Sequence, residues 1–199
     1  MKNSIVLFFL LIFSSCFSQN KFNKSLAEKF QKTINAEYAD AKTSPLMADD
    51  LKTFRALDFY PINGNFFVNA KFVKAVNEKP FEMKTSTNRK PKYIKYGTVF
   101  FTIGGKALQL NVYQDVELSK SDEYKDYLFL PFSDKTCGKE SYIGGRYIDL
   151  KTPNGKTITI DFNQSYNPYC AYNHKYSCPI VPLENDLNIE IKAGVKTFH

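Results

Sequence analysis

The apolar positions repeat with a helical period over the first part of the chain. Over 25–41 they recur every four residues, at Leu26, Phe30, Ile34 and Tyr38. Ser25 is placed to cap this helix, and Glu28, three residues further on, completes a capping box. After Ser44-Pro45 a second, shorter helix is predicted over 46–56, with its apolar side at Leu46, Leu51, Phe54 and Leu57. Such amphipathic stripes are typical of structural helices that pack on a core.

From residue 65 onward the period changes to two, the alternation of half-buried strands. Gly104-Gly105 and Asn154-Gly155 are dipeptides that permit the positive φ angles of tight hairpin turns. Strands are predicted at 66–72, 81–85, 99–103, 108–112, 126–132, 146–150, 157–163 and 187–192. This succession of short strands does not follow a βαβ pattern. The sequence therefore predicts a mainly β fold, a single antiparallel β-barrel or β-sandwich domain with one or two N-terminal helices.

Composition places the chain among folded globular proteins. Of the 199 residues, 43% are hydrophobic and 24% are charged, which excludes a disordered or collagen-like chain. Lys and Arg total 27 against 20 Asp and Glu, but the lysines are spread among acidic and neutral residues and only 3 Arg occur. This pattern lacks the dense basic face of a nucleic-acid-binding protein. It favours a solvated lysine-rich surface, with attraction to an anionic envelope surface as the alternative.

The N-terminal segment 1–18 has the build of a secretory signal. Lys2 supplies a positive charge, and an apolar run of 9 residues follows from Ile5 to Phe13. The run is too short to remain as a membrane-spanning helix. We therefore expect an exported protein, periplasmic or extracellular, whose mature part is a single domain over 19–199.

The site of signal cleavage decides whether the protein is tethered. Cleavage before Cys16, with acylation of its sulfur, would anchor the chain as a lipoprotein, at the outer membrane. Cleavage after Ser18 would release a chain that begins at Gln19. Phe13 and Phe17 fit a lipoprotein signal poorly, which favours release. A lipid on Cys16 is the only membrane contact that the sequence predicts.

A dense block of polar and aromatic residues occupies 129–194. Its pieces are Pro131-Phe132-x-Asp134-x-Thr136-x-Gly138-Lys139-Glu140-x-Tyr142, Gly145-Arg146-Tyr147, Asp161-Phe162-Asn163-x-x-Tyr166-Asn167-Pro168, Cys170-Ala171-Tyr172, Cys178-Pro179, Asn185-x-Leu187 and Ala193-Gly194. In this order and spacing the block resembles the bacterial domain of unknown function 1684 family, and the resemblance extends more loosely over 51–196. Cys137 and His174 depart from the family pattern, where we expect Asn and Pro. The family has no established activity, so the resemblance implies a domain and a surface to examine.

Polar side chains of this block are expected to gather at one end of the sheet. In the predicted strand 157–163, Asp161 and Asn163 project from the same face. Loops that precede this strand carry further carboxylates, a guanidinium and tyrosines. The candidate binding residues are Asp134, Glu140, Tyr142, Arg146, Asp161, Asn163, Tyr166, Asn167 and Tyr172.

Arg146 separates two interpretations of this set. In the first, it holds a carboxylate or phosphate with two hydrogen bonds, in a cleft for a small polar or anionic ligand or an envelope partner. In the second, it belongs to an internal network that needs no ligand. Because Arg146 alternates with Ile148 on the interior side of its strand, it requires a carboxylate partner. We expect Asp161 or Asp134 in that role, and Glu140 after them.

The sequence holds no G-x-S-x-G, H-E-x-x-H, P-loop or G-x-G-x-x-G motif. A non-catalytic, exported binding domain is therefore the leading hypothesis. The enzyme alternative is a hydrolase of an envelope polymer or ester, with Asp134, Glu140 or Asp161 as acid and base. A purely structural envelope protein is the third class. Carboxylates that converge in an open cleft would favour the enzyme, and a closed, paired set would favour binding or structure.

Cys137, Cys170 and Cys178 remain after export, an odd number in an oxidising compartment. Cys170 and Cys178 close a short loop and are candidates for a disulfide, with buried free thiols as the alternative. A zinc site of Cys137, Cys170, His174 and Cys178, or a Cys-His nucleophile pair, receives less support because no C-x₂-C knuckle is present. We predict no metal and no cofactor.

Overall fold

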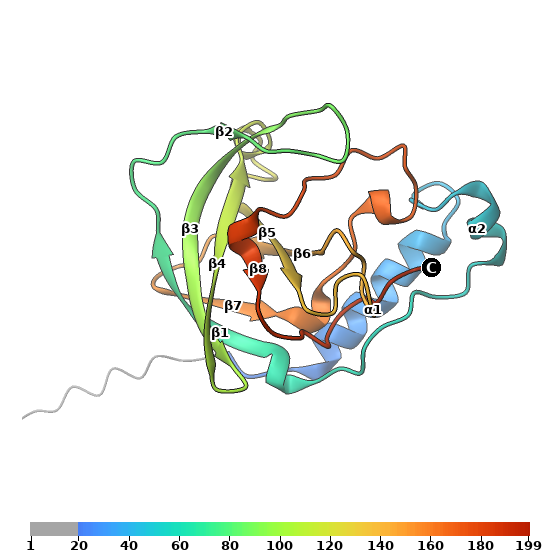
Figure 1. The fold of residues 1–199 in the computed structure, drawn as a ribbon, viewed down its shortest axis with the longest axis horizontal. Helices are drawn as coiled ribbons and strands as arrows, with labels where there is room; N and C mark the ends of the chain where they lie inside the picture. The colour runs from blue at the N-terminus through green and yellow to red at the C-terminus, as the bar shows by residue number, and fades with distance from the viewer. Residues whose placement is uncertain (1–19) are drawn as a thin grey trace, which may run out of the picture.

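The computed structural model describes residues 20–199, so the predicted signal, Cys16 and the cleavage after Ser18 lie outside the described residues. Two helices, α1 (Lys24–Ala39) and α2 (Ala48–Thr53), precede the strands (Figure 1). The strands are β1 (Phe67–Lys74), β2 (Phe81–Glu82), β3 (Lys92–Ile103), β4 (Lys106–Asp115), β5 (Tyr127–Asp134), β6 (Arg146–Lys151), β7 (Thr157–Asp161) and β8 (Asp186–Leu187). None of the helices within 20–199 is long and apolar enough to span a bilayer.

The strands form one curled, mainly antiparallel sheet, a half-barrel. Its order is β6-β5-β4-β3-β1-β7, with β2 added beside β3 and β8 beside β5. The β5–β8 pair is parallel and the other strand pairs are antiparallel. The predicted fold class is confirmed in its barrel form, because the sheet curls on itself and two helices precede it.

The core lies inside the curl of the sheet. Alternate side chains of each strand point inward, which places the apolar residues of the period-two pattern against one another. Fully buried members of this core include Val99, Leu110, Leu128, Leu130, Phe132, Ile160 and Ile191. The pattern of apolar positions therefore determined which face of each strand is buried.

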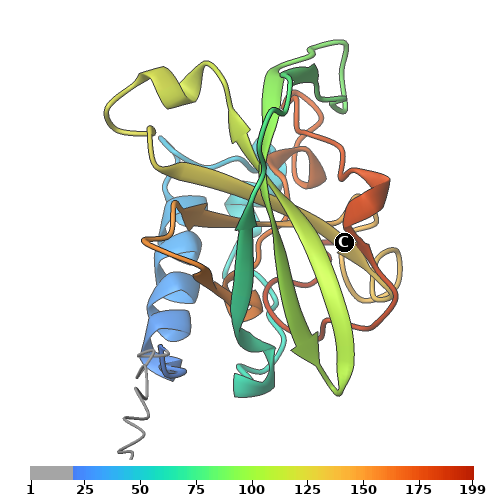
Figure 2. The same ribbon diagram turned by 90° about the vertical axis from the view of Figure 1, so that its left-hand side faces the viewer.

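Gly104 and Gly105 form the tight turn of the β3–β4 hairpin, as predicted. Their φ angles are +56° and +77°, and Ile103 pairs with Lys106 directly across the turn. This long hairpin runs along the sheet in Figure 2, with α1 at the left of that view.

The predicted hairpin at Asn154-Gly155 is wrong. The short connection 152–156 joins β6 to β7, but these strands lie at opposite ends of the sheet order. β6 pairs with β5, and β7 pairs with β1 from Phe67↔Asp161 to Lys71↔Thr157. Each strand finds its partner in a distant segment, so the two consecutive strands remain unpaired edges. The gap between them is called the seam here.

Three predicted strands are longer than the observed ones. The strand predicted over 157–163 ends at Asp161, because Phe162–Gln164 forms a 3₁₀ turn. The strand predicted over 81–85 is reduced to β2, and that over 187–192 is reduced to β8. Asp161 and Asn163 consequently meet across a turn rather than along a strand face.

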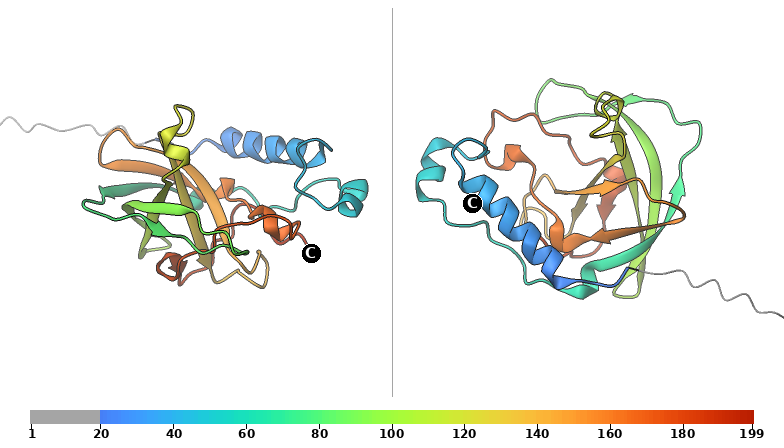
Figure 3. Two further views of the ribbon diagram at one scale, coloured as in Figure 1. Left: turned by 90° about the horizontal axis from the view of Figure 1, so that it is seen from above. Right: turned by 180° about the vertical axis from the view of Figure 1, so that it is seen from behind.

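α1 packs on the side of the molecule away from the β3–β4 hairpin (Figure 3). Its N-cap is Asn23, whose Oδ1 accepts from the Ser25 backbone N–H at 3.1 Å, so the predicted Ser25 cap is displaced by two residues. Ile34 and Tyr38 are buried against a second apolar cluster that contains Leu46, Leu57, Tyr172 and Val195. Leu26, predicted on the apolar face, is 55% exposed.

Candidate functional site

Arg146 lies at the centre of a closed polar network. Its side chain is fully buried, and Nη2 lies 3.0 Å from Oδ1 of Asp134, whose side chain is also fully buried. Nη2 donates to the carbonyl of Ile191 at 2.8 Å, and Nη1 donates to the carbonyl of Ala193. The predicted carboxylate partner is therefore Asp134, and Asp161 and Glu140 do not fill that role.

Both oxygens of the Asp134 carboxylate accept hydrogen bonds from the protein. Its Oδ2 accepts from the backbone N–H of Ile191 at 2.7 Å and from the Thr136 hydroxyl at 2.9 Å. These bonds attach the C-terminal segment to the end of β5. The geometry matches the internal-network interpretation, because both side chains are fully buried and bonded to each other and to neighbouring groups; of the guanidinium nitrogens only the buried Nε has no partner.

Three other predicted binding residues also make contacts between segments that are distant in the sequence. Buried Asn163 accepts from the Asn63 backbone N–H at 2.9 Å and donates to its carbonyl at 3.0 Å. Buried Asn167 donates to the carbonyl of Lys196 at 2.8 Å. Tyr172 packs perpendicular to Tyr38 with ring centroids 4.9 Å apart. These three side chains have structural roles and do not line the cavities described below.

Glu140 and Tyr142 lie apart from the buried pair. The exposed Glu140 carboxylate forms an ion pair with Lys192 at 2.9 Å. The hydroxyl of Tyr142 lies 4.0 Å from the Cys170 sulfur, and burial raises the pKa of this tyrosine to about 12. The predicted set is thus divided among several places and does not form one cleft.

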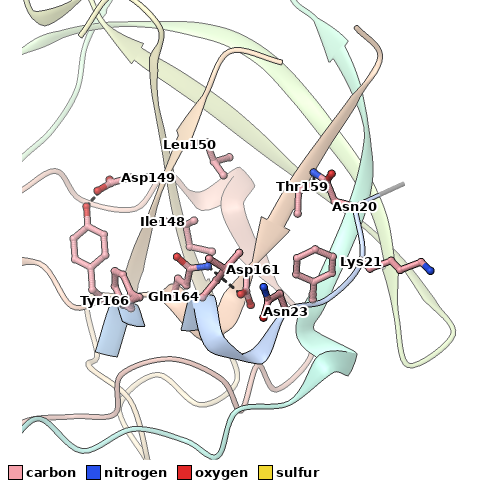
Figure 4. Close-up of a pocket in the computed structure, with 13 residues that line it drawn as sticks. Asn20, Lys21, Asn23, Ile148, Asp149, Leu150, Thr159, Asp161, Gln164 and Tyr166 are labelled. Atoms are coloured by element: carbon pink, nitrogen blue, oxygen red, sulfur yellow. Dashed lines mark hydrogen bonds between the residues drawn. The ribbon is translucent and has the colours of Figure 1, made fainter. Parts of the chain in front are cut away.

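A cavity of about 620 Å³ opens at the seam, bounded by β6, β7 and the first turns of α1 (Figure 4). We call it the seam cleft. Asp161 and Tyr166, of the predicted candidates, line it. Its full lining is Asn20, Lys21, Asn23, Leu26, Phe30, Phe67, Ile148, Asp149, Leu150, Thr159, Asp161, Gln164 and Tyr166.

Asp161 uses its carboxylate to cap the 3₁₀ turn that ends β7. Oδ1 accepts from the backbone N–H of Asn163 at 3.1 Å and from its side-chain amide at 2.7 Å. Oδ2 accepts from Nε2 of Gln164 at 3.0 Å, the bond drawn in Figure 4. Both oxygens are engaged, so this carboxylate is a structural part of the cleft wall.

Asp149 is the carboxylate that the residue pattern did not single out. It projects from β6 and accepts at Oδ1 from the hydroxyls of Tyr127 (2.7 Å) and Tyr166 (2.6 Å). Asp149 is an exposed residue; within 20–199 no protein donor bonds its Oδ2 and no Lys, Arg or His pairs with it. Burial, and next the charge of Asp149, raise the pKa of Tyr127 and Tyr166, so both hydroxyls remain protonated donors.

A second cavity, about 490 Å³, lies beside the seam cleft and shares Phe30, Asp149 and Tyr166 with it. We call it the aromatic chamber. Rings of tyrosine and phenylalanine dominate its wall. Its lining is Phe30, Thr33, Ile34, Glu37, Tyr38, Tyr93, Leu118, Tyr127, Phe129, Tyr147, Asp149, Tyr166, Pro168, Tyr169, Cys178 and Pro179.

A signal for this site was present in the sequence. Alternation along 146–150 places Tyr147 and Asp149 together on the face opposite Arg146. The tyrosines that bond Asp149 come from β5 and from the segment after β7, so their convergence required the tertiary fold.

The three cysteines of the described part are free thiols in this structure, and of them only Cys178 is buried as the free-thiol alternative expected. The candidate disulfide between Cys170 and Cys178 stays a prediction. Cys170 and Cys178 are nevertheless neighbours, since the Cys170 backbone N–H donates to the Cys178 sulfur at 3.2 Å. A hydrogen bond from the Cys178 thiol lowers the pKa of Cys170 to about 6, and the same interaction raises the pKa of Cys178.

Cys137 is remote from this thiol pair. Its sulfur lies 3.6 Å from Oδ1 of Asp134 and 3.8 Å from the Ser141 hydroxyl. The proposed four-ligand zinc set is therefore wrong, and across 20–199 no cluster of three His, Cys, Asp or Glu is arranged to hold a metal ion. His174 is exposed.

The fold and its two cavities define a mainly β, half-barrel domain with a helix-covered seam. Residues 52–196 match the model of a family described as protein of unknown function (DUF1684), and the chain belongs to that family. α1 precedes the matched range, so the helix that bounds both cavities lies outside the family match.

Solved structures share this fold, and one of them is of similar size. An uncharacterised protein of Haloarcula marismortui, solved by solution NMR, shares 28% sequence identity with this chain at a TM-score of 0.68. The similarity covers 87% of this chain and 94% of that one. No curated protein matches the sequence.

Proposed function

We propose that this protein is an exported envelope domain that binds a small polar ligand in the seam cleft and the aromatic chamber. The observation that carries the proposal is Asp149, a carboxylate shared by both cavities, oriented by two tyrosines and left with an unbonded oxygen. Polar groups that serve the fold alone, such as Asp134 and Asp161, are saturated by internal donors.

The dimensions and lining support a ligand site. Small-molecule pockets occupy roughly 300–1,000 Å³ and combine apolar or aromatic walls with a few placed polar groups. Both cavities fall within this range. Asp149 is the placed polar group, and the tyrosine rings form the wall.

An anionic ligand receives no support from Arg146. The guanidinium on which anion binding depended is buried and bonded to Asp134 and to backbone carbonyls. In the seam cleft the only basic side chain is Lys21, which extends away from Asp149 and Asp161 in Figure 4. The proposal is therefore for a polar ligand without a net negative charge.

The geometry favours binding over hydrolysis. A hydrolase that uses carboxylates as acid and base needs two of them with free oxygens that face one reacting bond. Asp134 and Asp161 are saturated, and the exposed Glu140 pairs with Lys192. A purely structural role accounts for Arg146 and for the two tyrosine bonds at Oδ1 of Asp149, while Oδ2 of this exposed residue has no protein donor and stays accessible to a ligand.

A thermal-shift screen of the exported protein with sugars, organic acids, nucleotides, organic cations and divalent metals tests the proposal. A ligand at 100 times its Kd stabilises the folded state by roughly 2.7 kcal/mol. Thr33→Trp places a large ring on the α1 side of the aromatic chamber, whereas Lys32→Trp places it outside both cavities on the same helix. We expect a stabilising compound whose effect is lost in Thr33→Trp and kept in Lys32→Trp. No shift with any compound, or shifts equal in both variants, would contradict the proposal.

A further inference from the structure

We infer that the aromatic chamber binds an organic cation, with its ammonium group beside Asp149. The inference rests on the proposed function and names the chemical class of the ligand. Three features of the chamber carry it: the sign of its charge, the arrangement of its rings, and the way its central carboxylate is held.

The chamber is acidic within a basic protein. Lys and Arg exceed Asp and Glu by 27 to 20 in the whole chain, yet the ionisable side chains of the lining are Asp149 and Glu37, with tyrosines and a cysteine, and no Lys, Arg or His. Many exposed carboxylates elsewhere pair with a lysine, as Glu117 does with Lys120 at 2.8 Å. Within 20–199 neither chamber carboxylate has such a partner. A cation that enters the chamber supplies the missing countercharge.

The rings of the wall stand at steep angles to one another. Tyr147 and Tyr166 are perpendicular, with an interplanar angle of 89° and centroids 5.9 Å apart. Phe129 packs on Tyr147 at 75° with centroids 4.7 Å apart. These are edge-to-face contacts within the wall, and Phe129 and Tyr147 are almost fully buried. The ring surface offered to a ligand therefore comes from the less buried members of the lining, Tyr127, Tyr166 and Tyr169. Aromatic faces that line a cavity are the groups that bind quaternary and alkylated ammonium ions. Each ring attracts positive charge through its negative face, so the rings select a cation.

The central carboxylate is held in place by neutral donors. Tyr127 and Tyr166 both bond the same oxygen, Oδ1 of Asp149, which leaves Oδ2 available for an N–H donor or an ammonium contact. Because their pKa values are raised, by burial first, the two tyrosines stay uncharged and do not compensate the carboxylate. The charge of Asp149 is thus directed toward the ligand rather than consumed within the protein.

A neutral, hydroxyl-rich ligand fits these features less well. Such a ligand would cover Asp149 and Glu37 while leaving both charges unpaired, and covering an unpaired charge is unfavourable. An anion would be repelled by both carboxylates. Charge complementarity therefore selects a cation.

Calorimetric titration with choline and with 3,3-dimethylbutan-1-ol separates charge from shape. The second compound replaces the quaternary nitrogen by carbon and is otherwise of nearly the same size. We expect choline to bind about tenfold or more tightly than the neutral compound. Asp149→Asn and Glu37→Gln should each reduce choline affinity by a larger factor than they reduce the affinity for the neutral compound. Asp122→Asn, at an exposed carboxylate outside both cavities, is the matched control and should have no effect.

The possible failures distinguish this inference from the proposed function. Equal affinity for choline and its neutral analogue, or choline binding that survives Asp149→Asn, overturns the cation inference. Absence of choline binding at about 10 mM, beyond the millimolar range of weak specific sites, overturns it as well. If a neutral compound instead stabilises the protein and loses its effect in Thr33→Trp, the proposed function stands without the cation. If no compound stabilises the protein in a way that Thr33→Trp abolishes, the proposed function and the cation inference both fail. Thermal melts of Asp149→Asn and Glu37→Gln establish that each variant is folded.

Discussion

Nη2 of Arg146 lies 3.0 Å from Oδ1 of Asp134, and neither side chain has any exposed surface. The guanidinium also donates to the backbone carbonyls of Ile191, Ala193 and Val195 and to the Thr136 hydroxyl. A buried ion pair of this kind holds distant segments in register, because removal of either partner leaves a charge without compensation. The pair belongs to the fold and not to a ligand site.

Arg146→Ala should therefore lower the free energy of unfolding by about 3–5 kcal/mol, the effect of stranding a buried charge. Urea denaturation of the variant and the wild type measures it. The matched control is Lys192→Ala, which breaks the exposed pair with Glu140 and should change stability far less, because exposed ion pairs contribute little. A nearly unchanged stability in Arg146→Ala would mean that the guanidinium is held for another purpose.

Gly194 should tolerate no side chain. Its φ is +78°, and a Cβ there would lie 2.0 Å from the Ser165 hydroxyl and 2.6 Å from the Ser165 carbonyl oxygen. Gly105 has a similar φ of +77° but open space around the added atom. Gly105→Ala should lose only about 1–2 kcal/mol from the left-handed conformation. Gly194→Ala should lose clearly more, and equal melting temperatures for the two variants would contradict the close packing.

Cys170 should react with iodoacetamide as a low-pKa thiol when the protein is kept reduced. Its pKa is lowered to about 6 by the hydrogen bond from Cys178, so the thiolate is present above that pH and is lost as the pH falls through it. The alkylation rate should rise between pH 5 and 7, by about tenfold per pH unit below the pKa, and level off above it. Cys178→Ala removes the donor and should move the inflection upward. An inflection near the ordinary thiol value in the unaltered protein would contradict the pairing.

The exported chain should begin at one of two residues that the sequence predicts. Intact-mass measurement of the protein from the producing cell distinguishes an N-terminus at Gln19 from an acylated Cys16. We expect Gln19 and no incorporation of radiolabelled palmitate. Label that is lost in Cys16→Ala would establish the lipid anchor instead, and an uncleaved chain would contradict export by this signal.

Local signals in the sequence predicted the elements whose partners are adjacent in the chain. The β3–β4 hairpin follows from its two glycines, and alternation along β6 places Arg146 in the interior. The Asn154-Gly155 hairpin failed because β6 and β7 obtain larger pairings with β5 and β1, a choice that turn residues do not encode. Because β6 and β7 do not pair with each other, the seam between them stays open. The sequence pattern singled out Arg146, whereas the candidate site proposed from the structure is centred on Asp149. The pattern missed Asp149 because the tyrosines that bond its carboxylate lie 22 and 17 residues away along the chain.

The position of a bound cation tests the account most directly. In an NMR experiment with selectively protonated tyrosine rings, choline is added to the protein and nuclear Overhauser effects from its N-methyl protons are recorded. We predict contacts with the rings of Tyr127, Tyr147 and Tyr166, the residues that surround Asp149, and their loss in Thr33→Trp but not in Lys32→Trp. Contacts with tyrosines outside the chamber, such as Tyr96 or Tyr142, without contacts to these three would contradict the assignment of the ligand site.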